Sequence, residues 1–205
     1  MVESNKLKVY YYGAHGAAQQ IRYTLALGGL AFEDECPTTH PPSQEDRDKW
    51  GSLGKNTTTN VPMLIDGDKV YTQSSAVLRV AARKGGLMPT GDDELYQVDN
   101  LIAAAADLRA ASYKAMAAFG ASPAAQDDFV KNVMPKHVGN LERLFGDNEY
   151  FVGGKLSVAD VAVYDVLATS CVALVPGCLT AFPKLDSFHK RIEALPKMAE
   201  YKKSE

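Results

Sequence analysis

A single helix-breaking stretch divides this chain of 205 residues into two halves of different texture. The stretch begins Gly-Gly-Leu-Met-Pro at residue 85, and adjacent glycines followed by a proline interrupt any helix. Before it, short strand-like apolar runs alternate with helix-like segments, whereas the pattern after it is entirely helical. We predict an α/β domain over residues 1–84, a linker over residues 85–92 and an all-α domain over residues 93–205.

Composition excludes several classes of protein. The 22 lysines and arginines against 25 aspartates and glutamates give a net charge of -3, whereas sequence-independent nucleic-acid binding requires an excess of basic residues. No apolar run approaches the ~18 residues of a membrane span, and we expect no signal peptide. Cys36, Cys171 and Cys178 form neither a disulfide framework nor a metal motif. We therefore expect a cytoplasmic protein without nucleic-acid, membrane or metal partners.

The first half reads β-α-β, then a loop, then β-β-α, which is the order of a thioredoxin-like domain. The first two strands should run parallel, and Asp66-Gly67 predicts a hairpin between the last two. A helix begins near Gln73, with a serine side chain available as its cap. The predicted strands cover residues 7–12, 32–36, 61–65 and 69–71, and helices cover residues 17–27 and 44–53.

The second half contains a succession of predicted helices. Ser157 and Asp160 have the spacing of a capping box at the start of one of them. The segment from Lys197 onward is highly charged, so we expect it to fray. The other predicted helices cover residues 93–119, 126–145 with an interruption near Pro135, and 182–195.

Three consecutive tyrosines end the first predicted strand. Alternation places Tyr10 and Tyr12 on one face of the strand and Tyr11 on the other. One interpretation is that all three are ordinary strand residues, because tyrosine has a high β-propensity. The other is that one hydroxyl points across the following turn towards a bound ligand.

Two further motifs allow a structural and a functional interpretation. Val61-Pro62 precedes an apolar strand and is a candidate cis peptide bond, which would expose the Val61 backbone to an extended peptide. Gln73-Ser74-Ser75 opens a helix, either as an ordinary cap or as a site where the helix N-terminus binds a carboxylate.

Together these features resemble the cytosolic glutathione transferases over nearly the whole chain, most closely the sigma-like, tyrosine-type class. The resemblance implies a thioredoxin-like domain with a glutathione site, an all-helical domain and a homodimer. The matching stretches are residues 7–12 with Ile21-Arg22-Tyr23, residues 61–64 with Asp66-Gly67, residues 71–79 and residues 153–160.

The resemblance also implies roles for individual residues. The catalytic tyrosine falls on Tyr11, with Tyr10 as the alternative register. Ala17 stands where the family often has an arginine, and the stretch between Trp50 and Pro62 is one residue short. Glutathione contacts are expected from Trp50 and Lys55 at its glycine end, Asn60, Val61 and Pro62 along its backbone, Gln73 and Ser74 at its γ-glutamyl carboxylate, and Asp99 towards the partner subunit's glutathione.

The implied activity is a detoxifying conjugation of glutathione to small hydrophobic electrophiles, in which the Tyr11 hydroxyl helps to ionise the glutathione thiol. A glutathione-dependent isomerase or peroxidase, or a non-catalytic binding or structural protein of the same fold, are the alternatives. The residues expected to contact the electrophile between the domains, which also suit plain packing, are Tyr12, Gly13, Ala14, Ala106, Ala110 and Tyr113.

Overall fold

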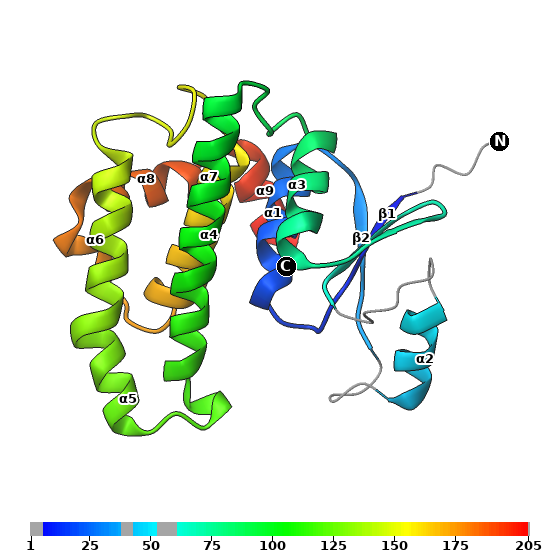
Figure 1. Cartoon of the computed structure of the whole chain (residues 1–205), viewed down its shortest axis with the longest axis horizontal. Coiled ribbons are helices and arrows are strands. Elements are labelled where there is room, and N and C mark those ends of the chain that lie inside the picture. The colour runs from blue at the N-terminus through cyan, green and yellow to red at the C-terminus, as the bar shows by residue number, and fades with distance from the viewer. Residues whose placement is uncertain (1–5, 38–42, 53–60, 205) are drawn as a thin grey trace. The chain divides into compact units, whose positions relative to one another are not determined.

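The chain folds into two compact units, Met1–Met88 and Pro89–Glu205, each with a buried apolar core (Figure 1). The first unit mixes strands with helices, and the second is helical wherever regular structure is described. The predicted fold class, α/β followed by all-α, is confirmed. No helix among the described residues is long and apolar enough to cross a lipid bilayer. The computed structural model describes residues 6–37, 43–52 and 61–204, apart from the side chain of Trp50.

The first unit follows the predicted order of elements. These are β1 (Leu7–Tyr10), α1 (Gln19–Leu27), β2 (Phe32–Glu35), α2 (Gln44–Ser52), β3 (Met63–Asp66), β4 (Lys69–Tyr71) and α3 (Ser74–Lys84). The four strands form one sheet in the order β2-β1-β3-β4, in which β1 and β2 are parallel and the other pairs antiparallel. Figure 1 shows α1 and α3 on one side of the sheet and α2 on the other.

Strand β1 is shorter than predicted, and its neighbours explain why. The register pairs Tyr10 with Met63 on one side and with Glu35 on the other, and these are the last pairs of both ladders. Pro62 precedes Met63 and has no N–H group, so it cannot extend the ladder beyond Tyr10. Tyr11 and Tyr12 therefore lie beyond the strand, next to the turn that follows it.

The second unit is organised around α7, every residue of which is buried. Its sequence is apolar on nearly all sides, which is typical of a helix that others surround. Helix α4 packs along it (Figure 1). The helices of this unit are α4 (Asp92–Ala115), α5 (Pro123–Asp128), α6 (Met134–Phe145), α7 (Val158–Leu167), α8 (Pro183–Glu193) and α9 (Pro196–Ser204).

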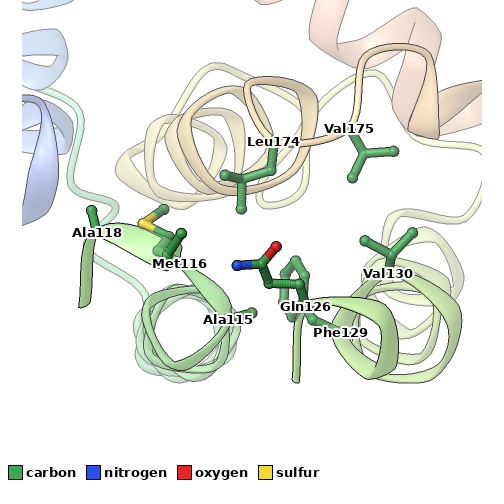
Figure 2. A pocket seen from close by; sticks show the side chains of 9 residues that line it. Ala115, Met116, Ala118, Gln126, Phe129, Val130, Leu174 and Val175 are labelled. Atoms are coloured by element: carbon green, nitrogen blue, oxygen red, sulfur yellow. The ribbon is translucent and has the colours of Figure 1, made fainter. Parts of the chain in front are cut away.

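Two π-helical turns interrupt this unit: η4 (Phe129–Val133) and η5 (Ala168–Val172). The predicted interruption near Pro135 corresponds to η4, which lies just before it. A proline ring conflicts with the carbonyl group four residues earlier, and a wider turn relieves that conflict. Residues of η4, the end of α4 and the segment after η5 border a pocket of about 400 Å³ (Figure 2).

Two predicted helix boundaries were wrong. The helix expected over residues 93–119 ends at Ala115, because Met116 is extended (φ -80°, ψ 127°). The expected fraying from Lys197 was also wrong, because Met198 is fully buried and anchors α9. The Lys202 ammonium also donates to the Tyr164 hydroxyl over 3.2 Å.

Candidate active site

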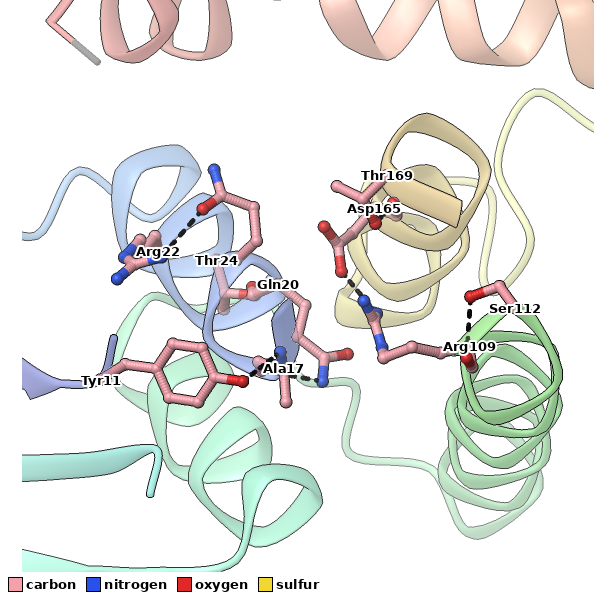
Figure 3. Close-up of polar contacts among 10 residues, drawn as sticks. Tyr11, Ala17, Gln20, Arg22, Thr24, Arg109, Ser112, Asp165 and Thr169 are labelled. Atoms are coloured by element: carbon pink, nitrogen blue, oxygen red, sulfur yellow. Dashed lines mark hydrogen bonds and ion pairs between the residues drawn. The ribbon is translucent and has the colours of Figure 1, made fainter. Parts of the chain in front are cut away.

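The Tyr11 hydroxyl lies at the start of the first helix. The Ala17 backbone N–H, in the 3-10 turn η1 (Gly16–Ala18) that leads into α1, donates to this hydroxyl over 3.2 Å (Figure 3). Gly16 has a positive φ of 42°, and a Cβ at this position would collide with the Tyr11 hydroxyl and ring. Glycine at position 16 is therefore required for the hydroxyl to reach the helix start.

Tyr11 differs from its two tyrosine neighbours in its surroundings. Tyr10 is buried and packs with Met63, and Tyr12 packs against the same pair. Burial, followed by the nearby Glu35 carboxylate, raises the pKa of Tyr10, which makes that hydroxyl harder to ionise. Tyr11 is half-buried, and its ring meets the ring of Tyr12 edge to face, with centroids 5.1 Å apart. The Tyr11 hydroxyl is the one that accepts the Ala17 N–H at the helix start.

Arg22 holds the turn between β1 and α1, a role that was not predicted although Arg22 belongs to one of the matching stretches. Its side chain is only 7% exposed, its Nε atom pairs with the Asp34 carboxylate at 2.7 Å, and Nη1 donates to the Ala14 carbonyl oxygen at 2.9 Å. The guanidinium carbon lies 6.0 Å from the centre of the Tyr11 ring. The signal in the sequence was an arginine on a buried helix face, beside the fully buried Ile21.

Val61-Pro62 is a cis peptide bond, as the sequence motif suggested. Pro62 is buried, whereas Val61 is half-buried and packs against Tyr10 and Met63. The cis bond therefore directly precedes β3. Strand β3 is the neighbour of β1, the strand that leads to Tyr11.

The start of α3 differs from the expected serine cap. Gln73 is the capping residue, its side chain makes no capping hydrogen bond, and Ser74 is the first helical residue. Gln73 is exposed and has φ 69° and ψ 108°, a conformation that costs free energy for any residue except glycine. Such an outlier is a reason to suspect a functional role, and the N-terminus of α3 is a position where backbone N–H groups favour an anion.

The other expected site residues fall into two groups. Gly13 and Ala14 are exposed in the turn after β1, whereas Asp99, Ala106, Ala110 and Tyr113 belong to α4 of the second unit. Helical spacing places the last three on one face of α4. Ala106 and Ala110 are exposed, and so is Asp99. Lys55, Asn60 and the side chain of Trp50 lie outside the described residues.

Tyr113 has neighbours that its position in the sequence did not reveal. Its ring lies 5.4 Å from the ring of Phe119, centroid to centroid. The nearby Arg109 guanidinium is buried and pairs with the Asp165 carboxylate of α7 at 2.5 Å (Figure 3). Although burial opposes its charge, the Asp165 carboxylate and then Tyr113 raise the pKa of Arg109. A buried ion pair therefore lies one helical turn from Tyr113.

The thiols of the chain offer little nucleophilic chemistry in the second unit. Burial raises the pKa of Cys171, which is fully buried, and of Cys178 as well. Their sulfurs are therefore held as protonated thiols, which are weak nucleophiles. Cys36 is exposed after β2. Within the described ranges, no group of three or more His, Cys, Asp or Glu side chains could hold a metal ion.

Comparison with known protein families places this geometry in context. Residues 7–83 match the model of the glutathione S-transferase N-terminal domain, and residues 106–205 match that of the C-terminal domain. Glutathione S-transferase Mu 1 of Oryctolagus cuniculus is 35% identical over 201 residues, covering 95% of this chain and 89% of that protein. A glutathione S-transferase of Dirofilaria immitis is 32% identical over 199 residues, covering 95% of this chain and 90% of that protein.

A solved structure agrees with these matches. The Pi-class glutathione S-transferase of Onchocerca volvulus superposes with a TM-score of 0.82 at 27% identity, covering 97% of this chain and 93% of that one. The class names among these relatives are Mu and Pi, and the Dirofilaria immitis protein carries none, so the sigma-like class stays a prediction. Since relatives above 30% identity span nearly the whole chain, and family models match both units, the chain belongs to the glutathione S-transferase family.

Proposed function

We propose that the chain conjugates glutathione to small hydrophobic electrophiles and that the Tyr11 hydroxyl activates the glutathione thiol. One observation carries the proposal: the Ala17 N–H donates to the Tyr11 oxygen, and within the described residues the hydroxyl proton is not donated to any acceptor. The hydroxyl is therefore fixed in place while its proton remains available for a ligand.

The energetics of this arrangement are sufficient. Glutathione supplies a thiol, whose pKa is about 8.5 in water, and lowering it by about 2 units needs about 2.7 kcal/mol. A hydrogen bond to a charged group contributes about 1.5–3 kcal/mol, so one aligned hydroxyl provides most of this free energy. The N–H from Ala17 polarises the Tyr11 hydroxyl and makes it a stronger donor.

We assign the remaining glutathione contacts from the chemical groups that each residue offers. Gln73 and Ser74, at the N-terminus of α3, suit the γ-glutamyl carboxylate, because backbone N–H groups at a helix N-terminus favour an anion and Ser74 adds a hydroxyl donor. The half-buried Val61, joined to Pro62, suits pairing with the peptide backbone of glutathione. We assign the glycine end to Trp50, Lys55 and Asn60, and we assign Asp99 to the glutathione of a partner subunit.

The electrophile contacts are proposed from both units. In the first unit we assign them to Tyr12, Gly13 and Ala14, which form the turn held by Arg22. In the second we assign them to one face of α4, where small side chains leave room beside Tyr113. The residues of that face are Ala106, Ala110 and Tyr113.

We further propose a cytoplasmic homodimer. The three cysteines, Cys36, Cys171 and Cys178, are free thiols, which suits a reducing compartment. The dimer rests on the family and on the assignment of Asp99 to a partner subunit. Sedimentation at several protein concentrations would measure the dimer directly.

The proposal is tested by measuring glutathione conjugation with several classes of electrophile for the wild type, Tyr11→Phe and Tyr10→Phe. We expect Tyr11→Phe to lower kcat about 10- to 100-fold, the value of one charge-assisted hydrogen bond, with little change in glutathione affinity. Tyr10→Phe is the matched control and should keep kcat within about twofold.

Three outcomes would redirect the proposal. Unchanged turnover in Tyr11→Phe with a loss in Tyr10→Phe would move the role to Tyr10. Glutathione-dependent isomerisation or peroxide reduction, without conjugation, would change the reaction but keep the site. Retention on immobilised glutathione without activity would indicate a binding protein.

A further inference from the structure

A cavity lies within the helical unit. Its volume of about 400 Å³ falls within the range of pockets that bind small molecules. None of its lining residues is assigned above to glutathione or to the electrophile. They come from the end of α4 and the turn after it, the α5–η4 segment and the chain after η5, and are Ala115, Met116, Ala117, Ala118, Gln126, Phe129, Val130, Leu174 and Val175 (Figure 2).

Apart from Gln126 the lining is apolar, and none of its side chains carries a charge. Val130 and Leu174 remain 37% and 40% exposed, which places them among the most exposed large apolar side chains of the described residues. Phe119, in the same short turn as Ala117 and Ala118, is 68% exposed. Exposed apolar side chains that gather around a cavity indicate a surface that another apolar molecule covers.

The backbone around this pocket is unusual on two sides. Phe129 and Val130 belong to the π-helical turn η4, and Leu174 and Val175 lie two and three residues after the end of the π-helical turn η5. The Ala173 N–H bonds to the Ala168 carbonyl oxygen over 3.0 Å, which is the wide spacing of a π-helix. Such turns are rare and occur frequently at functional sites. Here side chains of η4 and of the segment that follows η5 line the same cavity.

Gln126 is the one polar side chain of the lining. Its Nε2 atom donates to the Ala121 carbonyl oxygen at 3.4 Å, which orients the amide. Figure 2 shows the amide among the apolar side chains of the pocket. With the nitrogen engaged, the amide oxygen is the atom that can accept a hydrogen bond from a bound molecule.

We propose that this pocket binds a neutral, largely apolar small molecule that carries one hydrogen-bond donor, such as an alkylphenol. The apolar part contacts Met116, Phe129, Val130 and Leu174, and the donor bonds to the Gln126 amide oxygen. Methionine adapts its shape to different apolar partners, so the site accepts more than one such molecule. This site does not depend on the glutathione chemistry proposed above.

The test is titration calorimetry of the full chain with 4-heptylphenol and with 4-heptylanisole, in which a methyl ether replaces the hydroxyl. Leu174→Trp fills the pocket, and Leu144→Trp is its matched control, because Leu144 is an exposed leucine of α6 outside the lining. We expect 4-heptylphenol to bind the wild type and Leu144→Trp equally, and Leu174→Trp at least about tenfold more weakly. Thermal unfolding verifies that both variants fold.

A second comparison tests the hydrogen bond. Gln126→Leu should weaken 4-heptylphenol about fivefold, the value of one neutral hydrogen bond, and leave 4-heptylanisole unchanged. Saturating glutathione should not displace either probe. Equal binding by both tryptophan variants, displacement by glutathione, or self-association abolished by Leu174→Trp without any probe binding would overturn the proposal. The last result would assign the pocket to contact between copies of the chain.

Discussion

The first helix and α7 both begin against a polar side chain, but the two side chains use their hydrogen bonds differently. Asp160 is fully buried, and its carboxylate accepts from the Phe151 N–H at 2.8 Å and from the Ser157 N–H and hydroxyl at 2.8 and 2.9 Å. At the first helix, the half-buried Tyr11 hydroxyl accepts one N–H, from Ala17.

This difference separates a structural helix start from a functional one. The Asp160 carboxylate of the capping box is hydrogen-bonded to groups of the chain itself, so the capping box contributes to stability. The Tyr11 hydroxyl accepts a bond that fixes its position and retains a proton that it can donate. We infer that changes at Asp160 affect folding, whereas changes at the Tyr11–Ala17 start affect catalysis.

The largest expected effect is the loss of the capping box. Asp160→Ala leaves the buried backbone N–H groups of Phe151 and Ser157 without their acceptor, and we expect a loss of about 4 kcal/mol in the free energy of unfolding. Urea denaturation measures this change. The kcat of the protein that remains folded should match the wild type, and a catalytic defect in the folded fraction would break the comparison.

Gly16→Ala should produce the opposite pattern. The added Cβ collides with the Tyr11 hydroxyl, so we expect kcat to fall roughly 30-fold. Gly120→Ala is the matched control, because Gly120 also has a positive φ, 83°, but nothing lies within 4 Å of its added Cβ. Both variants should lose about 1 kcal/mol of stability from backbone strain, and equal kcat values in the two would contradict the role of the helix start.

The smallest effect concerns pH. Burial raises the pKa of Asp160 from its ordinary value of 3.8 to about 6. At a pH between these two values, the carboxylate therefore takes up a proton when the chain folds. This contribution to stability is present below about pH 4 and is lost as the pH rises through 6. We expect the wild type to lose about 2 kcal/mol more than Asp160→Asn between pH 4 and pH 7, by urea denaturation. Parallel losses in the two proteins would show that Asp160 ionises normally.

Local patterns predicted those parts of the molecule that depend on near neighbours in the chain. The Ser157–Asp160 capping box depends on two residues that are three positions apart, and the structure confirms it. The Asp66-Gly67 hairpin is equally local, and it joins β3 to β4 as expected. The cis bond at Val61-Pro62 was recognisable because a proline stands directly before an apolar strand.

Features that depend on distant contacts were missed or misjudged. Arg22 acts through Asp34 and the Ala14 carbonyl, which only the folded turn brings together. The end of β1 depends on Pro62, which lies just before the neighbouring strand β3. Helix α9 depends on the burial of Met198, which the highly charged sequence around it did not reveal. The unusual backbone of Gln73 likewise follows from the connection between β4 and α3 and not from its residue type.

The most direct test of the account is the pKa of the glutathione thiol in its complex with the protein, followed by ultraviolet absorbance as the pH is raised. We predict a pKa about 2 units lower in the wild type and Tyr10→Phe than in Tyr11→Phe, because the Tyr11 hydroxyl stabilises the ionised thiol. The same pKa in the wild type and Tyr11→Phe, with glutathione bound equally well, would contradict the proposed role of Tyr11.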